Sequence, residues 1–203
     1  MYRAKLYLFS ALAICFVSTA CQSIEKIIDS RKKPQKEIVT KVYEKNGLSF
    51  SHPNNWKVTE DSFLDDGRRI INVEDSDNTL FIITLLKPGH TIDLKEYSED
   101  FIKGMASDIP LGKIAEVKDD EANRTINNQN YLGIRKRFSI TLLGENVPHT
   151  IDFFLVTQQE NDAVIVISAP DEDLKVAEKE IQIIADSITF YFFMNLDSDD
   201  KQN

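Results

Sequence analysis

Three histidines and several groups of carboxylates are the residues of this sequence that could take part in catalysis or metal binding. No histidine lies in the HExxH spacing, and none has a cysteine or a second histidine nearby, so no zinc site is built from local ligands. Glycine-rich phosphate loops and the nucleophile motifs of hydrolases are also missing from the sequence. We therefore predict no catalytic residue, no cofactor and no metal site.

The surroundings of each histidine predict a structural position. His52 continues the alternation of Leu48 and Phe50, and we expect it to pack at the end of a strand. His90 lies beside a glycine and His149 follows a proline, so we expect both to be exposed in turns. An enzyme that gathers His52 or His149 with acids in a deep pocket stays open as an alternative, because catalytic constellations follow geometry and not sequence order.

One group of carboxylates imitates a calcium-binding loop. Asp75 and Asp77 have the spacing of the first two ligands, but Thr79 and Leu80 occupy the places that need Asp or Asn and then Gly. Short polar residues between two apolar runs are typical of a tight turn. We therefore predict a hairpin turn at this position.

The segment Arg135-Lys136-Arg137 is unusual in a chain with a net charge of −9. Residues two apart on a strand point the same way, so Arg135 and Arg137 could each meet a carboxylate with two hydrogen bonds. We name these two arginines as candidate partner-binding residues; the alternative is that they pair with the domain's own acids. Nucleic acid is not expected as a partner, because binding phosphate requires a basic surface.

The first twenty residues have the layout of a secretory signal. Arg3 and Lys5 precede a mostly apolar run over residues 6–17, which is followed by small residues. The run is too short to span a membrane, which takes about 20 apolar residues. We predict a signal peptide over residues 1–20.

Small residues that lead directly into Cys21 resemble the lipobox of bacterial lipoproteins. The resemblance implies that Cys21 begins the mature chain and carries fatty acyl chains such as palmitate, and two or more chains hold a protein stably on a membrane. Gln22 in the next position implies sorting to the outer membrane, where we expect the protein on the periplasmic face. Ser18 and Ala20 also satisfy ordinary signal peptidase, which would release a secreted or periplasmic protein instead.

The rest of the chain divides into a tether, one domain and a tail. Residues 21–37 are highly charged and contain Pro34, which indicates a lipid anchor and tether. Residues 38–193 have the length and apolar content of one globular domain. Residues 194–203 are polar and acidic, and we predict a flexible tail.

Alternation with a period of two dominates the domain and predicts a sheet. Strands are predicted over residues 69–73, 79–86, 132–142, 151–156 and 163–167. Several of these strands are apolar on both faces, which requires cover on both sides of the sheet.

Two stretches place apolar residues at helical spacing. Residues 93–109 begin with Asp93 and Glu96 in the spacing of a capping box, and residues 170–188 begin with Pro170 and three acids. The order strands, helix, strands, helix predicts an α+β fold, in which an antiparallel sheet has a helix packed on each face.

The opening of the domain resembles PsbP-like domains. Their signature, Y-x3-G-L-x-F-x2-P-x2-W, is carried here by Tyr43, Gly47, Leu48, Phe50, Pro53 and Trp56. The closing stretch over residues 153–188 is also similar, so the resemblance covers both ends of the domain. The family includes the extrinsic photosystem II protein, a Ran-binding nuclear transport factor and bacterial lipoproteins of the DcrB and LpqN type. The resemblance implies an α–β–α sandwich and an accessory or binding role, and it carries over no catalytic residue.

These observations together predict a non-catalytic binding or accessory module of the cell envelope. It would be held to the membrane by lipid on Cys21 and would bind an envelope protein. The alternatives are an envelope hydrolase or metal-dependent enzyme with a non-local site, and a small-ligand carrier with an apolar cavity between sheet and helix.

Overall fold

A computed structural model describes residues 37–108, 112–142 and 144–190 of the chain. The fold described below is that of residues 38–190, which belong to one compact unit. The predicted signal peptide, Cys21 and the acidic tail all lie outside the described residues.

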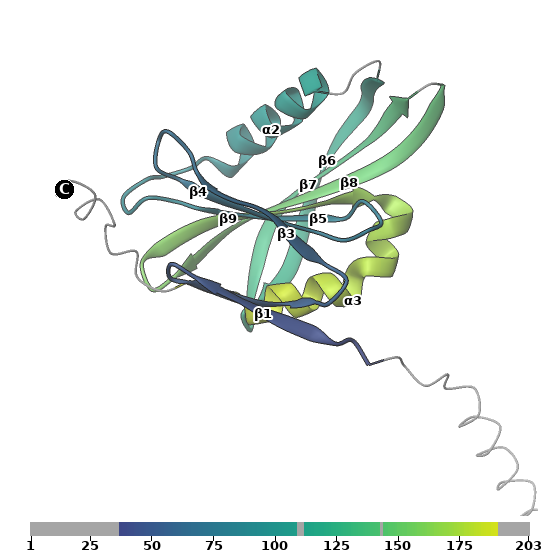
Figure 1. Ribbon diagram of the computed structural model, residues 1–203. Helices are drawn as coiled ribbons and strands as arrows, with labels where there is room; N and C mark the ends of the chain where they lie inside the picture. Colours follow the sequence, from purple (N-terminus) through teal and green to yellow (C-terminus); the bar gives the residue numbers. More distant parts are fainter. Residues whose placement is uncertain (1–36, 109–111, 143, 191–203) are drawn as a thin grey trace, which may run out of the picture. The chain divides into compact units, whose positions relative to one another are not determined.

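The described residues of the domain form a seven-stranded and a three-stranded antiparallel sheet together with two helices, α2 (Leu94–Asp108) and α3 (Asp171–Ser187) (Figure 1). In spatial order the larger sheet contains β3 (Lys57–Phe63), β4 (Arg69–Glu74), β5 (Leu80–Leu85), β9 (Asn161–Pro170), β8 (Glu145–Gln158), β7 (Gln129–Leu142) and β6 (Gly112–Ile126). The smaller sheet contains β1 (Thr40–Lys45), β2 (Leu48–Pro53) and β10 (Thr189–Phe190). The predicted α+β class with an antiparallel sheet is confirmed.

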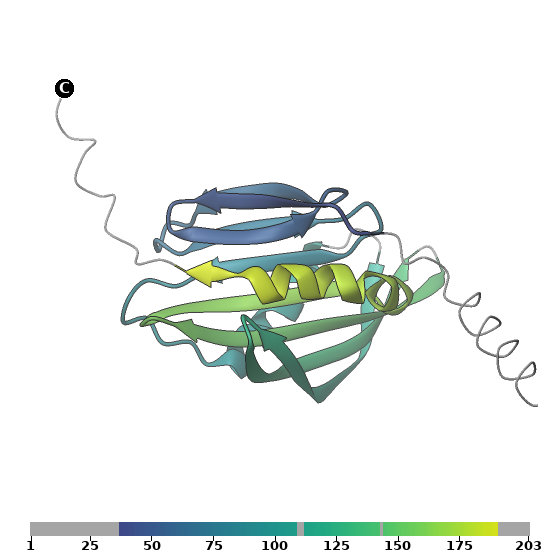
Figure 2. The same cartoon turned by 90° about the horizontal axis from the view of Figure 1, so that it is seen from below.

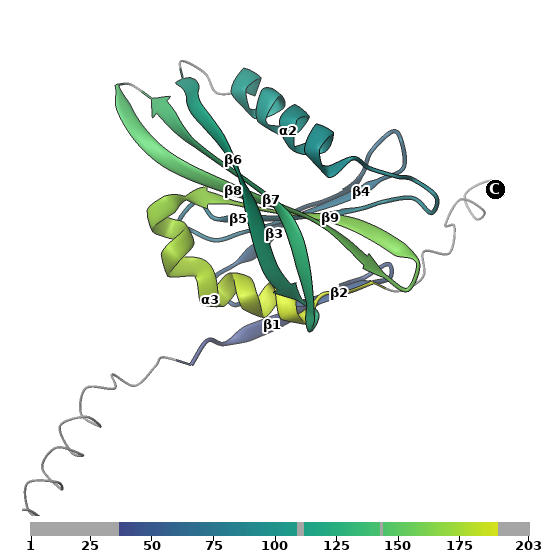
Figure 3. The ribbon, with the colours of Figure 1, turned by 180° about the vertical axis from the view of Figure 1, so that it is seen from behind.

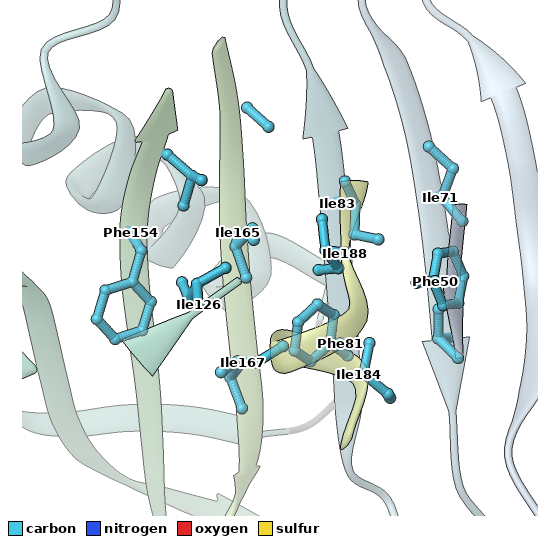
Figure 4. Packing of buried hydrophobic residues seen from close by; sticks show 14 of the residues in the cluster. Phe50, Ile71, Phe81, Ile83, Ile126, Phe154, Ile165, Ile167, Ile184 and Ile188 are labelled. Atoms are coloured by element: carbon cyan, nitrogen blue, oxygen red, sulfur yellow. The ribbon is translucent and has the colours of Figure 1, made fainter. Parts of the chain in front are cut away.

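Strand β9 explains why both faces of the larger sheet are apolar. Its alternate residues Val164 and Val166 belong to a cluster that includes Ile102 of α2. Ile165, on the other face, belongs to a second cluster that includes Ile184 of α3. Figure 4 shows Ile184 lying over strand residues of this second cluster, and Figure 2 shows α3 lying along the larger sheet. Alternate residues of one strand therefore pack into different parts of the core.

The predicted hairpin between β4 and β5 is confirmed. The Asp75 carboxylate accepts hydrogen bonds from the backbone N–H groups of Asp77 and Thr79, both at 2.8 Å. Asn78 completes the turn with a φ of 65°, a left-handed conformation that asparagine tolerates. The Asp75 side chain therefore serves the turn.

The helix boundaries follow the capping residues. Asp93 Oδ1 accepts hydrogen bonds from the backbone N–H groups of Lys95 and Glu96 at 2.8 and 3.1 Å, so Asp93 caps α2. Pro170 occupies the N-cap position of α3, and its first turn contains the three predicted acids. Both predicted helices are confirmed to within one residue at each end.

Strand β6 was not expected from the sequence. It forms one edge of the larger sheet, and most of its side chains face solvent. A bulge interrupts its pairing with β7 between Ala115 and Lys118, so the alternation of residue types changes phase in the middle of the strand. The charged segment that follows the bulge has no apolar face long enough to indicate a strand.

Candidate functional site

The three basic residues of strand β7 point to opposite sides of the sheet. Arg135 lies opposite Asp120 of β6 on one side and opposite Asp152 of β8 on the other. Two residues further along, Arg137 projects from the same face, whereas Lys136 projects from the other. The two candidate arginines therefore share one face, as the sequence predicts.

Arg135 and Asp152 form a bidentate ion pair. The Nε and Nη2 atoms of Arg135 each donate to one oxygen of the Asp152 carboxylate, both at 2.6 Å. The Asp152 side chain is only 2% exposed, and its hydrogen bonds raise the pKa of Arg135 above the usual value. A buried carboxylate without a partner is costly, so Arg135 is committed to neutralising Asp152.

Arg137 is held much more loosely. Its Nη1 atom lies 2.9 Å from Oδ2 of Asp120, and the two side chains are 51% and 45% exposed. An ion pair with this exposure contributes about 0–1 kcal/mol to stability. Lys118, another cation, lies directly opposite Arg137 on β6. Arg137 can therefore exchange its partner for an external carboxylate at small cost.

Lys136 is the buried member of the basic segment. The sequence did not predict this burial. Its ammonium group donates to both oxygens of Asp119 at 2.8 Å, while the Lys136 side chain is 4% exposed. The available signal was its place between Ile134 and Phe138 on the apolar face of the strand. Only an opposite charge on a neighbouring strand makes that position tolerable for lysine.

Arg124 connects the edge strand β6 to helix α3. Its two terminal nitrogens each donate to one oxygen of Glu178 at 3.1 Å, and Nη1 also donates to Gln182 at 3.2 Å. The Arg124 side chain is buried, while that of Glu178 is half exposed. On β6, Asp120, Ala122 and Arg124 alternate with residues of the other face, so Arg124 projects from the same face as Arg135. Because Arg124 bonds to Glu178, this is the face that α3 contacts.

A second polar network, also missed in the sequence, joins the two sheets. Arg69 of β4 donates to both oxygens of Asp61 in β3, at 2.7 and 3.1 Å, and also to the carbonyl oxygens of Lys45 and Asn46. The Tyr43 hydroxyl donates to Asp61 at 2.6 Å. Burial alone would raise the pKa of Asp61, but these hydrogen bonds outweigh it and hold the pKa well below its usual range. Burial and the bond to Asp61 together raise the pKa of Tyr43 to about 12.

Two histidines lie where they were expected. His52 is buried at the end of β2, where its ring tilts against Phe50 and its Nδ1 atom lies 2.9 Å from the carbonyl oxygen of Pro53. His90 is exposed in the loop after β5. Both observations match structural roles for these side chains.

The exposed turn expected for His149 is wrong. His149 lies inside β8, stacks on Phe138 with ring centroids 5.3 Å apart, and places Nε2 3.0 Å from Oγ of Ser168. Burial lowers the pKa of His149 to about 4. The preceding proline was misleading because Pro148 lies within the strand and not at a turn.

Within the described ranges, no group of three or more His, Cys, Asp or Glu side chains is arranged to hold a metal ion. The same residues include no helix that is both long and apolar enough to cross a membrane. The proposed lipidation site, Cys21, is outside these ranges.

No family model and no curated protein sequence matches the chain. Among solved structures it is similar to cyanobacterial PsbP (CyanoP) from Synechocystis sp. PCC 6803, with 16% identity over 78% of this chain and 96% of that one, at a TM-score of 0.48. It is also similar to LpqN, involved in cell envelope biogenesis of Mycobacterium tuberculosis, with 13% identity over 77% and 93% of the two chains and a TM-score of 0.39.

A third similar structure is the Saccharomyces cerevisiae Ran-binding protein Mog1p, with 16% identity over 74% of this chain and 87% of that one, at a TM-score of 0.37. Similarities of this size assign no activity, partner or location to the chain.

Proposed function

We propose that this protein is a lipid-anchored module of the cell envelope that binds a protein partner and catalyses no reaction. The proposal includes a PsbP-like α–β–α sandwich, an anchor of fatty acyl chains on Cys21 and a location on the periplasmic face of the outer membrane. The anchor is supported by the apolar run and small residues before Cys21. A domain carried in this way acts through contact with neighbouring envelope proteins.

The contrast between Arg135 and Arg137 carries the binding part of the proposal. Arg135 neutralises a buried carboxylate, whereas Arg137 is half exposed beside an equally exposed aspartate. Arginine provides planar, bidentate recognition of carboxylates, so an exposed and loosely held guanidinium suits an acidic partner. In this proposal Arg137 contacts the partner, and Arg135 keeps the surrounding strand in place.

Chemical crosslinking in native envelopes, followed by mass spectrometry, tests this function. We expect the wild-type protein to crosslink to a defined partner and the Arg137→Ala variant to crosslink several-fold less. Lys179→Ala, which removes an exposed cation from α3, is the matched control and should crosslink like wild type. Capture that is equal in Arg137→Ala and wild type would remove Arg137 from the binding surface.

The same preparation tests the anchor. The N-terminal peptide should carry the mass of acyl chains on Cys21, and Cys21→Ala should move the protein from the membrane fraction to the soluble fraction. An unmodified N-terminus in the membrane fraction would contradict the anchor. Turnover of a substrate by the purified protein would contradict the non-catalytic role.

A further inference from the structure

The ends of β6, β7 and β8 form a surface that helix α3 does not cover. The α3 helix begins at Asp171, whose carboxylate accepts a hydrogen bond from Thr150 Oγ1 at 2.7 Å, and Thr150 is buried. Beyond Thr150, Pro148 and Asn146 of β8 are exposed. Figure 3 shows these strand ends extending past the first turn of α3. In the described part of the chain this face has no partner.

Strand register defines which residues form the surface. Arg137 lies opposite Lys118, Ser139 lies opposite Ala115, and Thr141 lies opposite Lys113. All of these side chains point to the face that α3 contacts further along the sheet. We call this surface the outer face, and its residues are Lys113, Ala115, Lys118, Arg137, Ser139 and Thr141.

The outer face gathers cations in an acidic protein. Three of its six residues are basic and none is acidic, whereas the whole chain has a net charge of −9. The next residue on the same face of β6 is Asp120, which pairs with Arg137. Like charges directly opposite on neighbouring strands destabilise a sheet, and Lys118 faces Arg137 in this way. Neither Lys113 nor Lys118 forms an ion pair with any residue that the structure describes. Of the three cations, the described residues therefore neutralise Arg137 alone, through Asp120.

The remaining side chains of the outer face are small. Ala115 is exposed and Ser139 and Thr141 are partly exposed, so a second backbone can approach the strands closely. Thr141 donates to Asn146 at 2.5 Å, and both groups are at the surface. From Arg137 to Thr141 the strand advances about 13 Å, which equals four residues of an extended chain.

We propose that the outer face docks an extended, acidic segment of the protein partner. Acidic side chains four residues apart in the segment would match the separation between Arg137 and the Lys113–Thr141 pair of residues. This inference rests on the proposed binding function and names the chemistry of the partner. A carboxylate of the segment would replace Asp120 as the ion-pair partner of Arg137.

A membrane surface fits the outer face less well than a narrow peptide does. The acids in the first turn of α3 lie on one side of it, and the exposed Asp120 follows Lys118 on the same face of the edge strand. A flat anionic bilayer would meet these acids together with the cations, and the repulsion would offset the attraction. A single extended segment can contact the cations alone.

Fluorescence anisotropy with a short labelled peptide of alternating Glu and Ser tests the proposal at low ionic strength. We expect Lys113→Glu/Lys118→Glu to weaken binding at least about tenfold relative to wild type, because two ion pairs are replaced by repulsion. The matched control, Lys175→Glu/Lys179→Glu, makes the same change in net charge on exposed positions of α3 and should weaken binding far less. Circular dichroism of both variants checks that these surface changes leave the fold intact.

Three outcomes would overturn the proposal. Absence of peptide binding to the wild-type protein is the first, and equal weakening in the two double variants is the second. The third is binding to vesicles of phosphatidylglycerol and phosphatidylcholine that depends on Lys113 and Lys118 and exceeds peptide binding, which would assign the surface to a membrane. If any of these occurs while crosslinking still depends on Arg137, the proposed function stands. Only the proposal that the outer face docks an acidic segment is then wrong.

Discussion

Burial gives two arginines of one strand different roles. The carboxylate of Asp152 is almost fully enclosed and depends on Arg135, whereas Arg137 and Asp120 are about half exposed. Water screens the second pair and replaces its hydrogen bonds, but it cannot do so for the first. Charge alone therefore does not identify the residue that is available to a partner.

Removal of Arg135 is expected to cost far more stability than removal of its exposed counterpart. Arg135→Ala leaves the Asp152 carboxylate buried without a partner, and the free energy of unfolding should fall by about 3–5 kcal/mol. Arg137→Ala breaks an exposed pair and should cost about 0–1 kcal/mol. Urea unfolding of the two variants measures both values. Equal losses of unfolding free energy in the two variants would contradict the difference between the buried and the exposed ion pair.

Sequence reasoning found the basic segment but could not rank its members. The acids that decide their roles, Asp119 and Asp152, lie 17 residues away from their partners along the chain. Their positions depend on the registers of β6 with β7 and of β7 with β8, which local alternation does not determine. The burial of Lys136, the exposure of Arg137 and the position of His149 follow from those registers.

At the scale of elements, strands and helices with an apolar face were predictable. Strand β9 and both helices present apolar residues to the core at the expected period, and their positions agree with the structure. Strand β6 has mostly exposed side chains and a bulge at Glu116, whose φ of 59° breaks the alternation. An edge strand with charged residues on both faces has no pattern that separates it from a loop.

Two glycines of different elements should respond oppositely to alanine. A Cβ atom at Gly133 of β7 would collide with the carbonyl oxygen of Phe153 and lie 2.6 Å from Cδ1 of Phe154. Gly133→Ala should therefore lower the free energy of unfolding by about 1–3 kcal/mol or more, through overpacking. Gly104→Ala in α2 meets nothing within 4 Å and should raise it by about 0.5–1 kcal/mol.

Thermal or urea unfolding of both glycine variants checks this pair of predictions. A neutral Gly133→Ala would show that β7 and β8 can separate to admit a methyl group. Such tolerance would contradict the close packing of Phe154 against the backbone of β7.

At the scale of the whole molecule, acid stability depends on a buried side chain on the opposite side of the sheet from the outer face. Burial lowers the pKa of His149 from 6.5 to about 4, so the folded state binds this proton less readily than the unfolded chain does. The stability that the neutral ring contributes is fully present above pH 6.5 and is lost as the pH falls from 6.5 towards 4. The full loss amounts to about 3 kcal/mol.

His149→Gln should flatten the pH dependence of unfolding in this window. The urea midpoint of the wild type should fall between pH 6.5 and 4, and that of the variant should change less. His90→Gln, in an exposed loop, is the control and should follow the wild type. Asp61 affects stability only at more acidic values, because its pKa lies below the ordinary 3.8. Identical slopes in wild type and His149→Gln would contradict the role of His149.

The Arg69 network also has a mechanical consequence. Strand β1 begins two residues after residue 38 and pairs antiparallel with β2 from Thr40↔Pro53 to Lys45↔Leu48. A pull on the chain at residue 38 would peel β1 from its open end, one pair at a time, so each step resists only weakly. Tyr43 and Lys45 are clamped to Asp61 near the far end of the strand. Tension would therefore meet stronger resistance at this clamp, which ties β1 to β3 of the larger sheet.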